Sequence, residues 1–285
     1  GEARIAIVGP QLELSYPSEY LGAGPDTLRE IADGNHAFAD ILKNAERPVV
    51  IVGMGALARN DGDAVLGTVR KLAETCNLIR DDWNGFNVLH TAAARVGGLD
   101  IGFVPGENGR DTAGILAGAE AGELDLVYLL GADEVDTDKL GKAFVVYQGH
   151  HGDAGAHRAD VILPGSAYTE KNGTYVNTEG RVQLGRQAVQ PPGDAREDWS
   201  IIRALSDVLD AGLDYVTLGD VRAALSAANP IFDTVDEVTS ATWGAFGSDG
   251  DMDAAPFESP VANYYMTDPI SRASETMAEC TREFV

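Results

Sequence analysis

Short, continuous apolar runs recur along the chain, and each of them ends at a glycine. Five such runs occupy residues 4–9, 48–53, 124–131, 143–149 and 160–165. Runs that are continuously apolar, rather than alternating with polar residues, are typical of strands buried on both faces, as in parallel sheets. The pattern therefore predicts several parallel strands.

Amphipathic segments lie between these runs. Residues 61–77 place apolar side chains at helical spacing, with Asp61 or Asp63 positioned to cap the amino terminus, and so predict a helix. Cys76 lies on the apolar stripe of this helix, so we expect a buried thiol rather than a nucleophile. A second helix is predicted over residues 110–122. Strands that alternate with helices indicate a doubly wound α/β fold with a largely parallel sheet.

The pattern changes after residue 165. Residues 173–189 predict a β-hairpin that turns at Glu179 and Gly180. Two short helices are then predicted, over residues 195–210 and 217–229.

The last part of the chain has the composition of an extended tail. Residues 230–271 carry eight acidic residues and neither lysine nor arginine. Isolated aromatic residues within the tail would anchor it to a surface, and these are Trp243, Phe246, Phe257, Tyr264 and Tyr265. We therefore expect an α/β domain at residues 1–190, a helical extension at 191–229 and an acidic extended tail at 230–285.

The overall charge narrows the classes of partner. The formal net charge is −24 and the isoelectric point is about 4.4. Such an acidic chain repels phosphate backbones and anionic lipids, which argues against binding to nucleic acid or to a membrane surface. No apolar run approaches the roughly 20 residues that span a bilayer. With two cysteines, the chain alone cannot form a four-cysteine zinc or iron–sulfur site.

A dinucleotide-binding motif follows the second apolar run. Gly53, Gly55 and Ala58 match the pattern G-x-G-x-x-A directly after a predicted strand, with Asp81 and Asp82 further along. Against this function, the following sequence predicts a turn where the motif requires a helix. The alternative is an ordinary glycine-rich turn from a strand to a helix.

The stretch "QGHHGDAGAHRADVILPG", residues 148–165, is rich in histidine and carboxylate side chains. Such side chains could bind Zn²⁺ or Fe²⁺, but the three glycines of this stretch before His157 disfavour the helix that would align two ligands. The alternative is a loop at the carboxyl end of a strand, whose histidines bond to the backbone or to a neighbouring subunit.

Four charged residues surround the predicted hairpin, namely Glu170, Lys171, Glu179 and Arg181. They could serve acid–base chemistry, but no nucleophile accompanies them in a recognised setting. We therefore interpret them as turn residues and ion pairs.

Longer stretches carry a resemblance that the short motifs do not. They are "PVVIVGMGALARNDG", "LLGAD", "QGHHGDAGAHRADVILPGSAYTEKNGTYVNTEGRVQ", "PPGDAREDWSIIRALSDVL" and "YYMTDPISRASETMAE". In this order they resemble the 75 kDa subunit family of respiratory complex I, whose bacterial members are the G subunits of NADH-quinone oxidoreductase. The likeness covers essentially the whole chain. It corresponds to the carboxyl-terminal part of that family, which is similar to molybdopterin oxidoreductases.

The resemblance implies a domain without catalytic chemistry of its own. In this family, an amino-terminal module holds cysteine-ligated iron–sulfur clusters on the path from NADH to quinone. The carboxyl-terminal α/β part generally carries no molybdenum cofactor. We therefore expect no cofactor in this chain, and iron–sulfur clusters in a missing amino-terminal module or a partner chain. The expected function is a scaffold of the peripheral arm that supports this module. The alternative is a fragment of an active molybdopterin-dependent oxidoreductase.

The resemblance also implies partners, a location and a remnant cleft. We expect other peripheral-arm subunits of complex I as partners, with no nucleic acid and no direct membrane span. The expected location is the matrix side of the mitochondrial inner membrane, or the cytoplasmic face of a bacterial inner membrane. Molybdopterin enzymes bind their cofactor at the carboxyl ends of such strands. Five residues are therefore candidates for a vestigial cleft without catalytic or metal-binding function: Gly53, Gly55, Asp133, His150 and His151.

Overall fold

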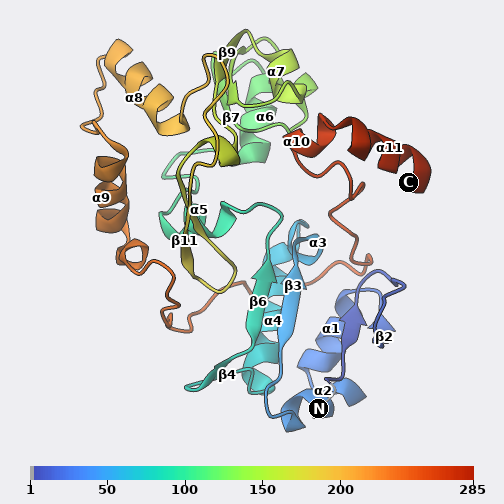
Figure 1. Ribbon diagram of the computed structural model, residues 1–285. Helices are drawn as coiled ribbons and strands as arrows, with labels where there is room; N and C mark the ends of the chain where they lie inside the picture. The colour runs from blue at the N-terminus through green and yellow to red at the C-terminus, as the bar shows by residue number, and fades with distance from the viewer. Residues whose placement is uncertain (1–2) are drawn as a thin grey trace. The chain divides into compact units, whose positions relative to one another are not determined.

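The computed structural model describes residues 3–285, and the chain divides into two compact units (Figure 1). Unit 1 contains the residues up to Ala92 together with Ser240–Ala262. Unit 2 contains Ala93–Thr239 together with Asn263–Val285. Each unit therefore joins an earlier segment to a part of the carboxyl-terminal region. Within residues 3–285, none of the helices combines the length and the apolar character needed to cross a membrane.

Unit 1 contains two pairs of parallel strands. β1 (Ala6–Val8) pairs with β2 (Glu19–Gly22), and β3 (Val50–Gly53) pairs with β6 (Phe86–Leu89). β4 (Ile79–Arg80) and β5 (Trp83–Asn84) form a short antiparallel pair. The helices are α1 (Pro25–Ala32), α2 (Ala37–Asn44), α3 (Met54–Leu57) and α4 (Gly62–Thr75).

The core of unit 1 lies between the strands and helices α1, α2 and α4. Its buried members include Leu28, Ile31, Ala39, Val52, Val65, Val69, Leu72, Cys76 and Leu78. Cys76 is fully buried, and burial raises the pKa of its thiol, which confirms the predicted core thiol. Helix α4 confirms the helix predicted over residues 61–77. Asp61 occupies its N-cap position, but the carboxylate bonds to Arg59 and to the backbone N–H of Asp253 instead of capping.

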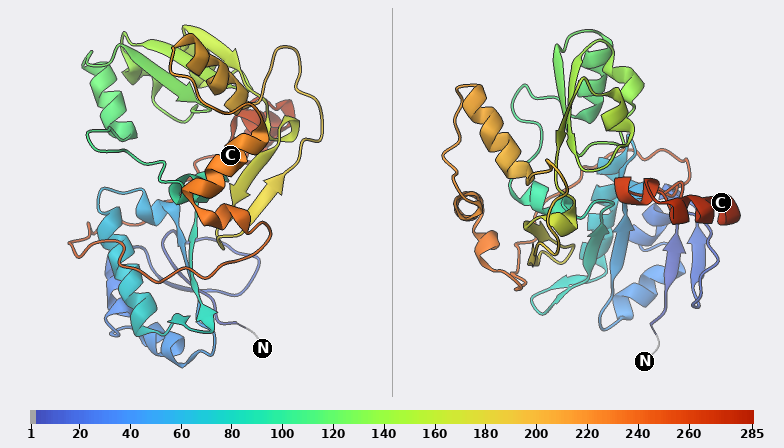
Figure 2. Two further views of the ribbon diagram at one scale, coloured as in Figure 1. Left: turned by 90° about the vertical axis from the view of Figure 1, so that its left-hand side faces the viewer. Right: turned by 45° about the horizontal axis from the view of Figure 1, so that its top comes forward.

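Residues 240–262, the carboxyl-terminal part of unit 1, contain neither a helix nor a strand (Figure 2). Phe257 is buried in the core of the unit. Trp243 packs edge-on against Phe86, with ring centroids 5.3 Å apart, and its Nε1 donates a hydrogen bond to Glu74. The predicted extended segment with aromatic anchors is therefore confirmed for this part of the tail.

Unit 2 is built around three parallel strands in the order β7 (Leu126–Leu130), β8 (Phe144–Gly149) and β9 (Val161–Pro164). Helices α6 (Thr112–Glu120) and α7 (Ala154–Arg158) contribute to the same apolar cluster as β7 and β8 (Figure 1). The buried members of this cluster are Ala119, Val127, Leu129, Leu140, Ala143, Val145 and Tyr147.

The remaining elements of unit 2 are a hairpin and several short helices, and some of them contribute to a second, smaller apolar cluster whose buried members are Val176, Val182 and Phe232. β10 (Gly173–Val176) and β11 (Val182–Gly185) form the predicted hairpin, and Gly180 has φ +81° at its turn. The helices are α5 (Arg95–Asp100), α8 (Asp198–Val208), α9 (Leu218–Ala228), α10 (Pro269–Arg272) and α11 (Glu275–Phe284). Short 3₁₀ helices occupy Thr137–Leu140, Tyr168–Glu170 and Pro230–Asp233.

The predicted α/β class is confirmed, with parallel strands, a hairpin, short helices and an extended acidic segment. The parallel pairing of residues 3–285 is divided among three small sheets. Two details of the tail prediction are wrong. Its last part is helical, because Asp268 and Ser274 cap α10 and α11 with their side-chain oxygens. Tyr264 is 82% exposed and is not an anchor. The three predicted segments stay a prediction.

Candidate functional site

The five residues predicted from the sequence fall into two groups. Gly53 and Gly55 lie at the end of β3 and in α3 of unit 1, whereas Asp133, His150 and His151 follow β7 and β8 of unit 2. Within unit 2, the structure brings Asp133 and the backbone of His151 to the same tyrosine hydroxyl. That the two groups form one cleft stays a prediction, since they belong to different units.

Asp133 is held by donors from its own unit. The hydroxyl of Tyr147 donates to Asp133 Oδ2 at 2.8 Å, and the backbone N–H of Gly155 donates to Oδ1 at 2.9 Å. Gly155 allows this close approach, because a Cβ there would lie 2.6 Å from the Tyr147 ring and 2.9 Å from the carboxylate. Burial and the adjacent Asp133 carboxylate raise the pKa of Tyr147 strongly. Tyr147 therefore stays a neutral donor.

The two adjacent histidines contact each other. Their Nδ1 atoms lie 2.6 Å apart and their rings are nearly perpendicular, with centroids 4.9 Å apart. One Nδ1 must donate and the other must accept, so at least one ring is neutral. Partial burial, followed by the nearby His151 and Lys171, lowers the pKa of His150. In the described part of the chain, no three histidine, cysteine, aspartate or glutamate side chains are grouped to hold a metal ion.

A second network adjoins the histidines. Gln148 is fully buried, and its Oε1 accepts a hydrogen bond from the hydroxyl of Tyr128. Its Nε2 donates to Asp198 Oδ1 at 2.9 Å, while Lys171 forms an ion pair with the other oxygen of Asp198. Sequence analysis missed this network. The available signal was the polar Gln148 at the end of an otherwise apolar strand, because a buried amide requires partners.

We call Asp133, Tyr147, Gln148, His150, His151, Lys171 and Asp198 the strand-end cluster. Helix α10 closes the neighbouring loop, because Arg272 binds Asp153 through Nε at 2.5 Å and Glu134 through a terminal nitrogen at 2.7 Å. Asp133, Gln148 and Asp198 of the cluster, and Asp153 beside it, are therefore held by contacts that the chain itself provides.

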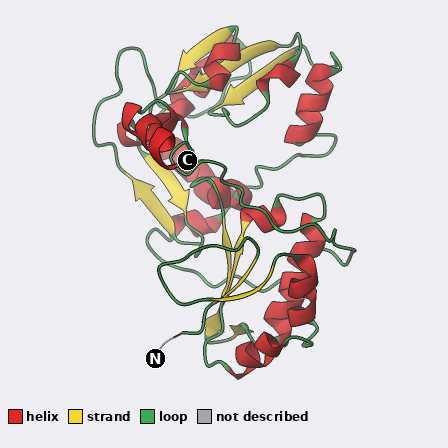
Figure 3. Ribbon diagram, turned by 90° about the vertical axis from the view of Figure 1, so that its right-hand side faces the viewer, coloured by secondary structure: helices red, strands yellow, loops and turns green. Residues whose placement is uncertain are grey.

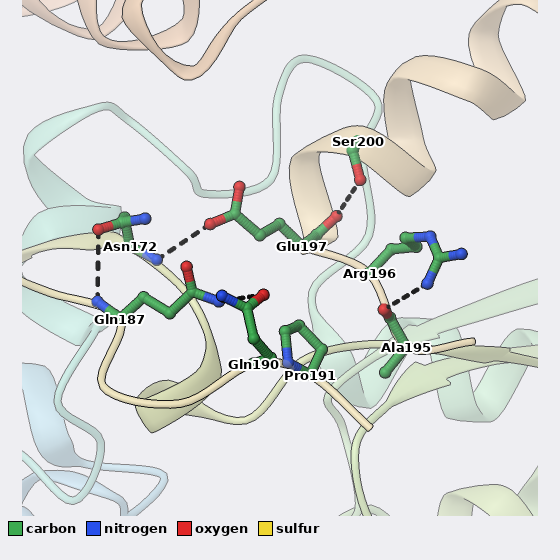
Figure 4. Close-up of a pocket in the computed structure, with 8 residues that line it drawn as sticks. All are labelled: Asn172, Gln187, Gln190, Pro191, Ala195, Arg196, Glu197 and Ser200. Carbon is green, nitrogen blue, oxygen red and sulfur yellow. Dashed lines mark hydrogen bonds between the residues drawn. The ribbon is translucent and has the colours of Figure 1, made fainter. Parts of the chain in front are cut away.

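A polar pocket of about 490 Å³ lies beside the cluster in unit 2 (Figure 4). Its lining residues are Asn172, Gln187, Gln190, Pro191, Ala195, Arg196, Glu197 and Ser200. The backbone N–H of Asn172 donates to Glu197 Oε1 at 3.0 Å, and Trp199 donates to Oε2 at 2.7 Å. The carboxylate of Glu197 thus connects the start of α8 with the segment before β10 through a hydrogen bond.

The glycine motif of unit 1 is covered by the tail. A Cβ on Gly55 would lie 2.1 Å from the carbonyl oxygen of Glu258 and 2.9 Å from Cδ of Pro260. The helix that follows the motif, α3, has four residues and ends at Leu57. Gly55 therefore allows the close approach of the tail backbone, at the position where the dinucleotide interpretation would place a phosphate.

The charged residues around the hairpin act as turn residues. Glu179 lies 3.1 Å from Arg181, and hydrogen bonds from Asn177 and Arg181 lower the pKa of its carboxyl group. Glu170 accepts a hydrogen bond from the backbone N–H of Ala167. These contacts confirm the interpretation as turn chemistry and ion pairs, while Lys171 belongs to the strand-end cluster.

Comparisons with known proteins identify relatives over the whole chain. The profile of the molybdopterin oxidoreductase family matches residues 1–208, and that of the C-terminal region of the NADH-ubiquinone oxidoreductase G subunit matches residues 237–280. The chain is 47% identical to the mitochondrial NADH dehydrogenase [ubiquinone] iron-sulfur protein 1 of Solanum tuberosum, over 98% of this chain and 37% of that protein. It is 44% identical to the NADH-quinone oxidoreductase G subunit of Rickettsia bellii, over 98% of this chain and 40% of that protein.

The chain therefore spans about 40% of the length of these curated relatives. Among solved structures, a formyltransferase/hydrolase complex of Methylorubrum extorquens with methylofuran matches at a TM-score of 0.47 and 17% identity. That match covers 68% of this chain and 62% of the other.

Proposed function

The chain belongs to the molybdopterin oxidoreductase family, and from this premise we propose that it is a non-catalytic scaffold domain of the peripheral arm of complex I. It would support the iron–sulfur module that carries electrons from NADH to quinone. The names of the relatives support this function, since they are an iron-sulfur protein of NADH dehydrogenase and a subunit of NADH-quinone oxidoreductase.

The observation that carries the proposal is the internal pairing of the strand-end cluster. Both carboxylate oxygens of Asp133 accept hydrogen bonds from the chain itself, and Asp198 binds Gln148 and Lys171. A general acid or base must instead be within hydrogen-bond reach of a substrate. Side chains that already bind each other hold the ends of the strands together, which is a structural function.

The molybdopterin cofactor implied by the family name does not fit the described residues of either unit. In unit 2, the donors and acceptors at the strand ends already bind each other, including the N–H of Gly155. In unit 1, the space at Gly55 contains the backbone of Glu258 and the ring of Pro260.

The proposed partners are other subunits of the peripheral arm, especially the iron–sulfur module. The clusters themselves would lie in an amino-terminal module or in a partner chain. We place the chain peripherally on complex I, at the matrix side of the mitochondrial inner membrane or at the cytoplasmic face of a bacterial inner membrane. The net charge of −24 supports partners other than nucleic acid.

Native mass spectrometry of the gently purified chain with its companions tests this function. We expect a mass of several respiratory subunits, with no pterin or molybdenum on this polypeptide. A mass excess that matches a pterin dinucleotide, with stoichiometric molybdenum, would overturn the scaffold function and support an active oxidoreductase fragment. An abundant free monomer in native extracts would also contradict it.

A further inference from the structure

A large cavity opens within unit 1. Its volume is about 1190 Å³, and its lining includes Ala6 and Val8 of β1, Ile51 and Gly53 of β3, Leu28 of α1 and Val69 of α4. The volume exceeds the roughly 300–1,000 Å³ of clefts that hold small molecules. We call this cavity the strand slot.

One wall of the slot is the edge of β1 that does not pair with β2, here called its second edge. On the first edge, the carbonyl of Ile5 and the N–H of Gly9 form hydrogen bonds with the β2 segment. In a strand, the backbone groups of alternate residues point to opposite edges. The N–H and C=O groups of Ala6 and Val8 therefore point to the second edge, and both residues line the slot.

The opposite wall of the slot is the unpaired edge of β3. The N–H of Val50 donates to the carbonyl oxygen of Gly85, next to β6. The backbone groups of Ile51 and Gly53 therefore point to the opposite edge, and both residues line the slot. Within residues 3–285, β1 pairs with β2 alone and β3 with β6 alone. Two strand edges thus border one cavity.

The slot is lined by apolar side chains that no other described part of the chain covers completely. Leu28 and Val69 line it although they belong to the buried core cluster. Val49, just before β3, and Ile51 of β3 also line the slot, and these aliphatic residues are 45% and 60% exposed. Leu89, at the end of the paired strand β6, is 50% exposed. Parallel strands are normally covered on both faces. The helices of unit 1, however, lie on one side of its strands (Figure 3).

We propose that the strand slot binds an extended apolar segment, which adds a strand between β1 and β3. The segment comes from the part of the longer, 75 kDa-type polypeptide that precedes the region matched by this chain. Two observations identify this occupant. The relatives are longer, since the chain covers 37% and 40% of them, and residues 237–280 match a profile of the carboxyl-terminal region of such subunits. The additional length of such a polypeptide therefore lies largely before the matched region.

A second copy of the chain fits the slot less well. Each copy carries a net charge of −24, and two such chains repel each other. Strand addition explains the backbone geometry as well as the apolar lining, because main-chain hydrogen bonds provide affinity and side-chain pockets provide specificity. The inference rests on membership of the family and on the slot, and it does not require the scaffold function.

The test uses the full chain and the part of the Rickettsia bellii relative that lies before the region aligned with it, produced as a separate polypeptide. Hydrogen–deuterium exchange is measured with and without this polypeptide. We expect the amides of Ala6, Val8, Ile51 and Gly53 to exchange about tenfold more slowly in its presence. Unchanged exchange at these four amides, or no binding up to about 100 µM, would overturn the proposal.

A pair of variants tests the slot directly. Ile51→Asp introduces a charge at a position that is 60% exposed in the chain alone, so the variant is expected to fold. Losing the burial of one aliphatic side chain should weaken the affinity roughly 10- to 100-fold. The control is Val238→Asp, in a loop of unit 2 and 48% exposed, which should leave the affinity unchanged.

The remaining outcomes are also decisive. Equal affinity of the wild type and Ile51→Asp would overturn the proposal, as would dimerisation of the chain through the slot without the added polypeptide. Pterin found on this chain would overturn the scaffold function while slot binding persists, so the two failures are distinguishable.

Discussion

The strand-end cluster of unit 2 and the strand slot of unit 1 both border parallel strands, but they differ in how their groups are paired. In the cluster, Asp133, Gln148 and Asp198 bind partners from the chain itself. In the slot, strand edges and aliphatic side chains face a cavity. Polar residues at strand ends therefore do not by themselves indicate a binding site. The region that we propose to bind a partner is the apolar strand slot of unit 1.

The largest expected effect comes from removing the cover that the tail provides to unit 1. Phe257 is buried in the core and its ring lies beneath the Arg59 guanidinium, 5.4 Å from the ring centroid. Phe257→Ala should lower the free energy of unfolding by about 3–5 kcal/mol, because it leaves a cavity. Urea unfolding followed by tryptophan fluorescence measures the change, since Trp83 and Trp243 both lie in unit 1. Tyr264→Ala is the control, since this ring is 82% exposed and its removal should have little effect.

The next effect tests the internal pairing of the strand-end cluster. Asp133→Ala removes two acceptors and leaves the hydroxyl of Tyr147 and the N–H of Gly155 buried without them. We expect a loss of about 3 kcal/mol in urea unfolding, since a hydrogen bond to a charged group contributes roughly 1.5–3 kcal/mol. Asp133→Asn should lose much less, because its amide can accept from Gly155 and donate to Tyr147. Equal losses in both variants would contradict this pairing.

Local patterns predicted the elements better than they predicted their neighbours. The glycine-ended apolar runs correctly predicted β1, β3, β7, β8 and β9, and the hairpin turns at Gly180 as predicted. These features depend on residues that are close in sequence. The pattern shows that a strand is buried but not which strand pairs with it, so the division of the parallel strands of residues 3–285 among three small sheets was not predictable.

The candidate site shows the same limit. Asp133 and the two histidines were identified because they follow apolar runs and because the family resemblance implies a cofactor cleft at such strand ends. The partners of Asp133, however, come from β8 and from the start of α7. The glycine motif suggested a cofactor, whereas its neighbour in the structure is the tail. Arg59, just after the motif, bonds to Ala255 at a separation of 196 residues, which no short motif can reveal.

A smaller effect separates the two glycines of the motif. Gly55→Ala should lower stability by about 1–3 kcal/mol, because overpacking forces the backbone apart. The neighbour that must move is the carbonyl oxygen of Glu258, 2.1 Å from the added Cβ. Limited proteolysis within residues 253–262 should become faster. Gly53→Ala is the matched control, since an added Cβ there meets no atom within 4 Å. Faster cleavage in both variants, or in neither, would contradict the covering of Gly55 by the tail.

The smallest effect is a dependence of the strand-end cluster on pH. The folded chain lowers the pKa of His150, mainly through partial burial and then through His151 and Lys171. As the pH falls through about 6.5, the unfolded chain therefore binds more protons than the folded chain, and the contribution of His150 to stability is lost. If both imidazole rings carried a second proton, neither Nδ1 atom could accept, and the hydrogen bond between them would be lost. Unfolding free energies at pH values above and below 6.5 should thus differ less in His150→Gln than in the wild type.

The control for this prediction is His157→Gln. It replaces an exposed histidine of α7 and should keep the wild-type dependence of stability on pH. An unaltered pH dependence in His150→Gln would show that the histidine pair is not coupled to folding. In that case the cluster is held by Asp133, Gln148 and Asp198 alone.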